Sequence, residues 1–105
     1  MDVLNKSTMK EKHVLVCTWS PNEKWKGLSD VEKREFLTAV AASAASAKKG
    51  GMDILGWGAL DRAVSNPAPQ SFCGIFAVDN RDSLHAVDQA IELCGWYEYF
   101  DHVNG

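Results

Sequence analysis

The stretch HVLVCTW, residues 13–19, decides the fold class because it is apolar at successive positions and not only at every second one. Its β-branched and aromatic residues favour a strand and Pro21 ends it, so we predict a β-strand over residues 12–20. A sheet with one face in water alternates polar and apolar residues along each strand. Val14 and Leu15 are both apolar and point to opposite faces, which indicates a sheet covered on both faces.

The other elements follow from caps and spacing. Ser29 with Glu32 three residues later is the capping-box pattern. Six alanines between residues 39 and 47 give this helix a thin face that can pack closely, and Gly50 suits a left-handed cap. The further predicted elements are a helix over 29–49, strands over 52–60 and 71–79, a helix that begins near 79–82 and ends at Gly95, and a strand over 96–103.

The order β-α-β-β-α-β is that of a ferredoxin-like α+β fold, a four-stranded antiparallel sheet with two helices on one face. The strand over 71–79, SFCGIFAVD, is also apolar on both faces. Two helices can cover only one of these faces. A second copy of the same sheet, related by a two-fold axis, is the simplest cover for the other face, so we predict a homodimer.

Length and composition describe one globular domain. The chain has 105 residues, 46% apolar and 24% charged, which is enough for one core and excludes a disordered chain. Residues 1–11 are polar and unpatterned, so we predict a flexible tail followed by a single domain over 12–105. No apolar run approaches the roughly 20 residues of a membrane helix, and the N-terminus lacks the core of a signal peptide. We therefore expect a cytoplasmic protein.

The charge distribution excludes some partners. The net charge is −3, and residues 50–105 hold two Arg against eight Asp and Glu, giving −6. A nucleic-acid backbone or an anionic membrane surface requires a basic patch. The only basic cluster, Lys48 with Lys49, suits the C-terminal end of a helix dipole. We therefore expect neither nucleic acid nor a membrane as a partner.

The stretch WYEYFDHV, residues 96–103, makes the predicted last strand strongly aromatic. With this strand, the element order and the two-sided sheet, the chain over residues 12–105 resembles the dimeric α/β-barrel superfamily. That group includes antibiotic-biosynthesis-type monooxygenases and stress-responsive barrel proteins, with cofactor-independent oxygenases, haem-degrading enzymes, cyclases, lyases and proteins without known catalysis. The resemblance implies a barrel-shaped dimer and a pocket between sheet and helices for a small aromatic or polyketide-like ligand.

In this topology the last strand lies antiparallel beside the first. If His13 pairs with His102, then Cys17 faces Glu98 and all four share one face with Trp19. Glu98 among aromatic residues is a candidate general acid or base, with His13 and His102 as further proton-handling groups. A register slip of one residue would disperse this group, and the sequence leaves the register open.

Aromatic residues supply the candidate ligand pocket. Trp57 lies between Gly56 and Gly58, which leave one face of a strand bare so that something approaches closely there. Trp25 follows the first strand as either a lid or a loop anchor. Core packing is the alternative role for most of these rings. The predicted substrate-binding residues are Trp19, Trp57, Trp25, Tyr99 and Cys17.

No spacing predicts a metal site. The three cysteines are an odd number without metal-type spacing, and two histidines without a third ligand make a poor site. We therefore expect no metal and no cofactor. In haem-binding members of the superfamily that the chain resembles, a histidine on the second helix can ligate iron. His85 lies on the flank of that predicted helix, so a haem-binding barrel protein stays as an alternative.

Two further functions remain open. The first is a small-molecule enzyme, a cofactor-independent monooxygenase or related cyclase or lyase, that acts on an aromatic or enolisable substrate. The second is a non-catalytic ligand-binding or stress-response barrel protein. A pocket of several hundred Å³ with convergent polar groups favours the enzyme, and a solid interior favours the second function.

Overall fold

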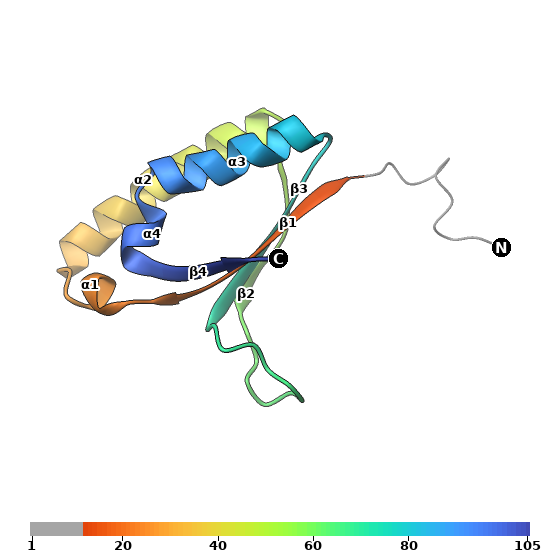
Figure 1. Cartoon of the computed structure of the whole chain (residues 1–105). Coiled ribbons are helices and arrows are strands. Elements are labelled where there is room, and N and C mark those ends of the chain that lie inside the picture. Colours follow the sequence, from red (N-terminus) through yellow and green to blue (C-terminus); the bar gives the residue numbers. More distant parts are fainter. Residues whose placement is uncertain (1–11) are drawn as a thin grey trace.

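The computed structural model describes residues 12–105, so the predicted tail over 1–11 lies outside the described residues. The elements, in order, are β1 (His13–Pro21), α1 (Glu23–Lys26), α2 (Asp30–Lys49), β2 (Asp53–Ala59), β3 (Phe72–Val78), α3 (Arg81–Leu93), α4 (Trp96–Tyr99) and β4 (Phe100–Asn104). The strands form one antiparallel sheet in the order β2-β3-β1-β4. The two long helices, α2 and α3, lie on the same side of it (Figure 1). The predicted α+β class, βαββαβ order and four-stranded antiparallel sheet are confirmed.

Helix α2 begins and ends where predicted, but the left-handed residue that follows it is not the predicted one. The Ser29 side chain accepts from the backbone N–H of Glu32, and the Glu32 side chain accepts from the backbone N–H of Ser29, which completes the capping box. At the other end Gly50 has a φ of −80° and is not left-handed, whereas Gly51 has a φ of +106°. The left-handed conformation therefore comes one residue later than predicted.

The segment predicted as the last strand is divided. After α3, which Asn80 caps, Gly95 adopts a φ of +83° and residues 96–99 form the helical turn α4. Trp96 and Phe100 are four residues apart, and their rings stack with centroids 4.1 Å apart in the core. This packing overrides the strand propensity of the aromatic run. Only residues 100–104 pair with β1, so the prediction of a strand over 96–103 is wrong at its start.

The register between β1 and β4 also differs from the predicted one. Trp19 pairs with His102 and Cys17 with Asn104, a shift of six positions from the pairing of His13 with His102. Because the turn α4 uses four residues, β4 reaches only the second half of β1. An even shift keeps each side chain on its face, so Trp19 and His102 still share a face, but His13 does not approach His102.

The two faces of the sheet are covered unequally. On the helix side the buried side chains include Leu15, Cys17, Trp19 and Phe76. On the other side Val14 is 45% exposed and Val103 53% exposed, although both are apolar. The predicted two-sided apolar sheet is therefore present, and within residues 12–105 the second face stays largely open.

Candidate functional site

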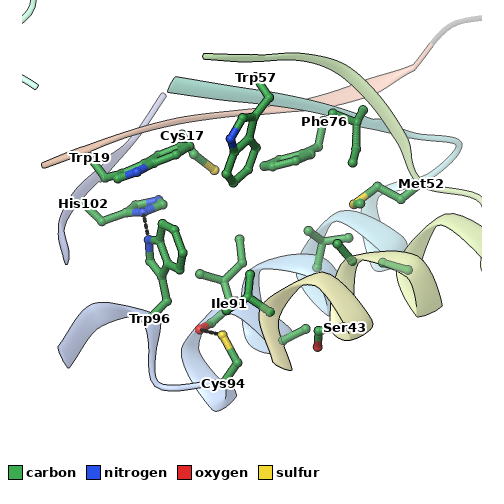
Figure 2. A pocket seen from close by; sticks show the side chains of 16 residues that line it. Cys17, Trp19, Ser43, Met52, Trp57, Phe76, Ile91, Cys94, Trp96 and His102 are labelled. Carbon is green, nitrogen blue, oxygen red and sulfur yellow. Dashed lines mark hydrogen bonds between the residues drawn. The ribbon is translucent and has the colours of Figure 1, made fainter. Parts of the chain in front are cut away.

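A cavity of about 110 Å³ lies between the helix side of the sheet and the helices α2 and α3 (Figure 2). All four strands and both long helices contribute to its wall, and almost every contributing side chain is apolar. The lining residues are Cys17, Trp19, Val40, Ser43, Ala44, Ala47, Met52, Ile54, Trp57, Phe76, Val87, Ala90, Ile91, Cys94, Trp96 and His102.

Small side chains keep the helices from filling this space. The α2 face that we expected to pack closely presents Ala44 and Ala47 to the cavity, and α3 adds Ala90. Neither α2 nor α3 has a fully buried residue. The methyl group of an alanine at these positions is too short to contact the sheet. The alanines therefore leave a space that larger side chains would have filled.

Three tryptophans form the aromatic part of the wall. The ring centroid of Trp19 lies 4.7 Å from that of Trp57 and 5.4 Å from that of Trp96. The rings of Trp19 and Trp96 meet edge to face. Trp19 is buried, whereas Trp57 is 58% exposed and stands at the rim of the cavity. The predicted placement of Trp19 and Trp57 at one pocket agrees with this geometry.

The glycine that accommodates Trp57 is on the neighbouring strand. A Cβ atom at Gly74 of β3 would lie 2.9 Å from Cε3 of Trp57, closer than side chains tolerate, so the indole packs directly on the Gly74 backbone. By the β2–β3 register Gly56 and Gly58 pair with residues of the opposite face. A Cβ at Gly58 would meet nothing within 4 Å. Gly56 and Gly58 therefore leave side-chain space on the open face of the sheet, and they add no space to the cavity.

His102 is held firmly at one end of the cavity. Its ring is nearly parallel to that of Trp19, at 10° and 6.2 Å between centroids. The indole Nε1 of Trp96 donates to Nδ1 at 3.0 Å, and Nε2 lies 2.7 Å from Oδ1 of Asn104. An indole N–H can only donate, so Nδ1 is the acceptor and Nε2 carries the proton that Asn104 accepts.

Cys17 is a buried thiol and not an activated nucleophile. Its side chain is 1% exposed, and burial, with a smaller contribution from the nearby Asp88 carboxylate, raises the pKa of Cys17 to about 11. The reactive form of cysteine is the thiolate, which a raised pKa suppresses at neutral pH. Cys17 therefore contributes to the wall of the cavity and not to covalent chemistry.

Comparison with protein-family models finds a match to a family of unknown function, DUF6616, over residues 12–105. The chain belongs to the DUF6616 family. No match was found among curated proteins or among solved structures. The match covers the whole domain described above, so the sheet, the two helices and the cavity are all parts of the DUF6616 region. No helix within residues 12–105 is long and apolar enough to cross a membrane.

The two other candidate catalytic residues of this DUF6616 domain lie away from the cavity. Glu98 is exposed on α4, where its backbone carbonyl accepts from the side chain of Asn22. His13 is exposed at the start of β1 and pairs with Val78. The predicted grouping of Glu98, His13 and His102 depended on the wrong register, so the structure does not bring these three side chains together.

Trp25 and Tyr99 belong to a second aromatic cluster. Trp25 contacts the rings of Phe36, Tyr99 and Phe100 at 5.7, 5.9 and 4.8 Å between centroids, and neither Trp25 nor Tyr99 lines the cavity. Of the two roles considered for Trp25, the loop anchor fits these contacts and the lid does not. His85 is exposed in the first turn of α3 and is also absent from the cavity wall.

The sequence also carried a signal for lining residues that we did not predict. Val40, Ala44 and Ala47 recur at helical spacing on α2, as do Val87, Ile91 and Cys94 on α3. Such stripes identify the side of a helix that faces the sheet. They do not distinguish a packed contact from an unfilled one, because that depends on how far the helix stands from the strands.

Proposed function

We propose that this DUF6616 protein binds a small apolar molecule, about the size of one aromatic ring, between its sheet and its two long helices. The observation that supports this most strongly is the cavity of about 110 Å³ with its apolar wall. Apolar cavities in proteins stay dry and take up apolar guests, and an engineered one of about 150 Å³ binds benzene. Trp57 at the rim offers a ring to the part of a ligand that extends outward.

The side chains of the cavity wall fit a non-catalytic binding site better than the active site of an enzyme. General acid–base catalysis needs a side chain that is free to exchange a proton with the substrate. The thiol of Cys17 is protonated, and both ring nitrogens of His102 already have partners. The cavity is also smaller than the several hundred Å³ expected for a substrate pocket with convergent polar groups.

An enzyme without a cofactor, a monooxygenase or a related cyclase or lyase, is the second candidate. It rests on His102, whose imidazole lines the cavity. A substrate hydroxyl would have to take the place of the Trp96 indole at Nδ1 before His102 could accept a proton. Oxygen uptake with a small quinol tests the monooxygenase form of this function. Uptake by the wild type that falls about 10²- to 10⁴-fold in His102→Gln would support it, and no uptake by the wild type would reject it.

We also propose that a second copy of the chain covers the open face of the sheet. Exposed apolar side chains there include Val14, Leu55 and Val103, and the bare Gly56 and Gly58 permit close approach at one edge. Sheets that pack face to face lie about 10 Å apart with interdigitated side chains. A homodimer formed in this way would have the arrangement of the α/β barrels that the sequence resembles.

Calorimetric titration with toluene tests the proposed binding function. We expect saturable binding of one toluene per chain in the wild type. Ala44→Leu places a larger side chain in the cavity wall and should abolish that binding while the circular dichroism spectrum is kept. Leu37→Met is a matched control on the exposed side of the same helix and should bind toluene normally. Equal binding to the wild type and Ala44→Leu would place the ligand elsewhere.

A further inference from the structure

A short chain of hydrogen bonds runs from Trp96 in the cavity wall through His102 to Asn104. Trp96 donates to Nδ1 of His102, and Nε2 of His102 lies 2.7 Å from Oδ1 of Asn104. Separately, the Tyr97 hydroxyl donates to Oδ1 of Asp88 at 3.4 Å. The Tyr97 ring also lies edge to face on the His102 imidazole, with centroids 5.1 Å apart. Two elements, α4 and β4, supply the three residues of this chain.

The chemistry of its two ends gives this chain one direction. Trp96 can only donate a hydrogen bond, and Oδ1 of Asn104 can only accept one. Between them, His102 accepts at Nδ1 and donates through Nε2–H to Asn104. Each donor therefore has an acceptor, with no conflict along the chain. Aligned bonds of this kind polarise one another and hold their members in a single arrangement.

The chain also removes the strongest hydrogen-bond acceptor from the cavity wall. Nδ1 of His102 is occupied by the Trp96 indole, as Figure 2 shows. The remaining polar groups of the wall are poor acceptors or point elsewhere: the Cys94 thiol donates to the carbonyl of Ile91, and the Ser43 hydroxyl is turned away from the indole rings (Figure 2). The indole N–H groups of Trp19 and Trp57 are donors.

We propose that Trp96 determines the specificity of the cavity: by occupying Nδ1 of His102, it selects ligands whose buried part carries no hydroxyl or amine. This inference rests on the proposed binding function and adds the class of ligand to it. A ligand hydroxyl buried here would lose its hydrogen bond to water and find no acceptor, which is costly. A hydrocarbon ring has no such loss.

Toluene and phenol form a pair of probes that have nearly the same shape and differ in one hydroxyl. Calorimetry should be carried out with both on the wild type, on Trp96→Phe and on Trp25→Phe. Trp96→Phe keeps a ring in the wall and frees Nδ1, so the affinity for phenol relative to toluene should rise about tenfold or more. Trp25→Phe makes the same change in the neighbouring aromatic cluster and should leave the ratio as in the wild type. A ratio that does not change in Trp96→Phe would overturn the proposal.

The tautomer of His102 provides a second measurement, made on the wild-type protein. In ¹⁵N NMR spectra at pH 8, Nε2 of His102 should carry the proton and Nδ1 should have the shift of an unprotonated nitrogen. A protonated Nδ1 would overturn the hydrogen-bond chain, whether or not Trp96→Phe folds. If the expected tautomer is seen but neither probe binds the wild type, the chain stands, and both the binding function and the specificity assigned to Trp96 are rejected.

Discussion

At the scale of single residues, the environment of Trp57 depends on a neighbour that lies 17 positions further along the chain. The sequence led correctly to Trp57 as a pocket residue, since glycines in a strand leave room for a close approach. The glycine beneath its ring is nevertheless Gly74 and not Gly56 or Gly58. Because side chains alternate between the two faces along a strand, Gly56 and Gly58 lie on the face opposite to Trp57. Only the β2–β3 register brings Gly74 under the indole.

Trp57→Ala should weaken toluene binding by tenfold or more while it costs less than about 2 kcal/mol of stability. The reason is that the side chain is 58% exposed, so its removal leaves little enclosed space. Calorimetry gives the affinity and urea denaturation the free energy of unfolding. A loss of about 3–5 kcal/mol, the usual cost of removing a core aromatic residue, would show that Trp57 is structural instead.

Cys17 should make the stability of the protein depend on pH in the alkaline range. Its folded pKa of about 11 lies above the ordinary thiol value of 9.0, so the unfolded thiol ionises first and rising pH favours unfolding. The contribution is fully present below about pH 9 and is lost by about pH 11, at about 2–3 kcal/mol for two pKa units.

The comparison of the wild type with Cys17→Ala at pH 8 and at pH 10.5 isolates this effect from other titrating groups. Because only the wild type loses the contribution of the buried thiol, the difference in unfolding free energy between the two proteins should shrink as the pH rises. A difference that stays constant over this range would show that the Cys17 thiol ionises as easily in the folded state as in the unfolded state.

At the scale of elements, the sequence predicted every strand and both long helices, because caps and periodicity are local signals. Ser29 caps α2 as expected, Asn80 caps α3 within the predicted start at 79–82, and the centres of the first three strands agree. The short helix α1 was not predicted. The one predicted element that fails does so over residues 96–99. Their strand propensity is high, but a helical turn buries the stacked rings of Trp96 and Phe100 in the core, and strand propensity alone does not reveal this burial.

Gly95 should be the residue that permits α4. It has a φ of +83°, and a Cβ there would meet only Phe36 Cε1 at 4.0 Å, so the cost of Gly95→Ala is backbone strain and not a clash. We expect a loss of about 1–2 kcal/mol. Gly50→Ala, at a φ of −80°, is the matched control and should change stability by less than about 0.5 kcal/mol. Equal losses in urea denaturation would refute this role for Gly95.

At the scale of the whole molecule, the two-sided apolar character of the sheet could be predicted from the sequence, and the size of the cavity could not. The pattern of β1 alone indicated that both faces avoid water. The size of the cavity depends on how far α2 and α3 stand from the strands. The residues of the site depend on the β1–β4 register, which differs by six positions from the predicted one. Four predicted site residues therefore line the cavity, Cys17, Trp19, Trp57 and His102, while Glu98, His13, Trp25 and Tyr99 do not.

Val103→Asp should dissociate the proposed dimer without unfolding the protomer. Val103 is 53% exposed on the open face, so a carboxylate there is tolerated in the monomer and becomes costly only when a second sheet covers it. Light scattering should give twice the chain mass for the wild type and the single mass for the variant. Leu93→Asp, at a residue that is 79% exposed at the end of α3, should remain dimeric. A monomeric wild type at micromolar concentration would contradict the dimer.

The central claim is that the space between the sheet and the helices is a binding site, and a crystal structure of the protein soaked with toluene tests it most directly. The account predicts electron density for one ring per chain, in contact with Trp19, Trp57, Ile91 and Trp96 and close to Cys17. The hydrogen bond from Trp96 to His102 should be intact. A cavity that is empty at saturating toluene, or a ring bound only on the open face of the sheet, would contradict it.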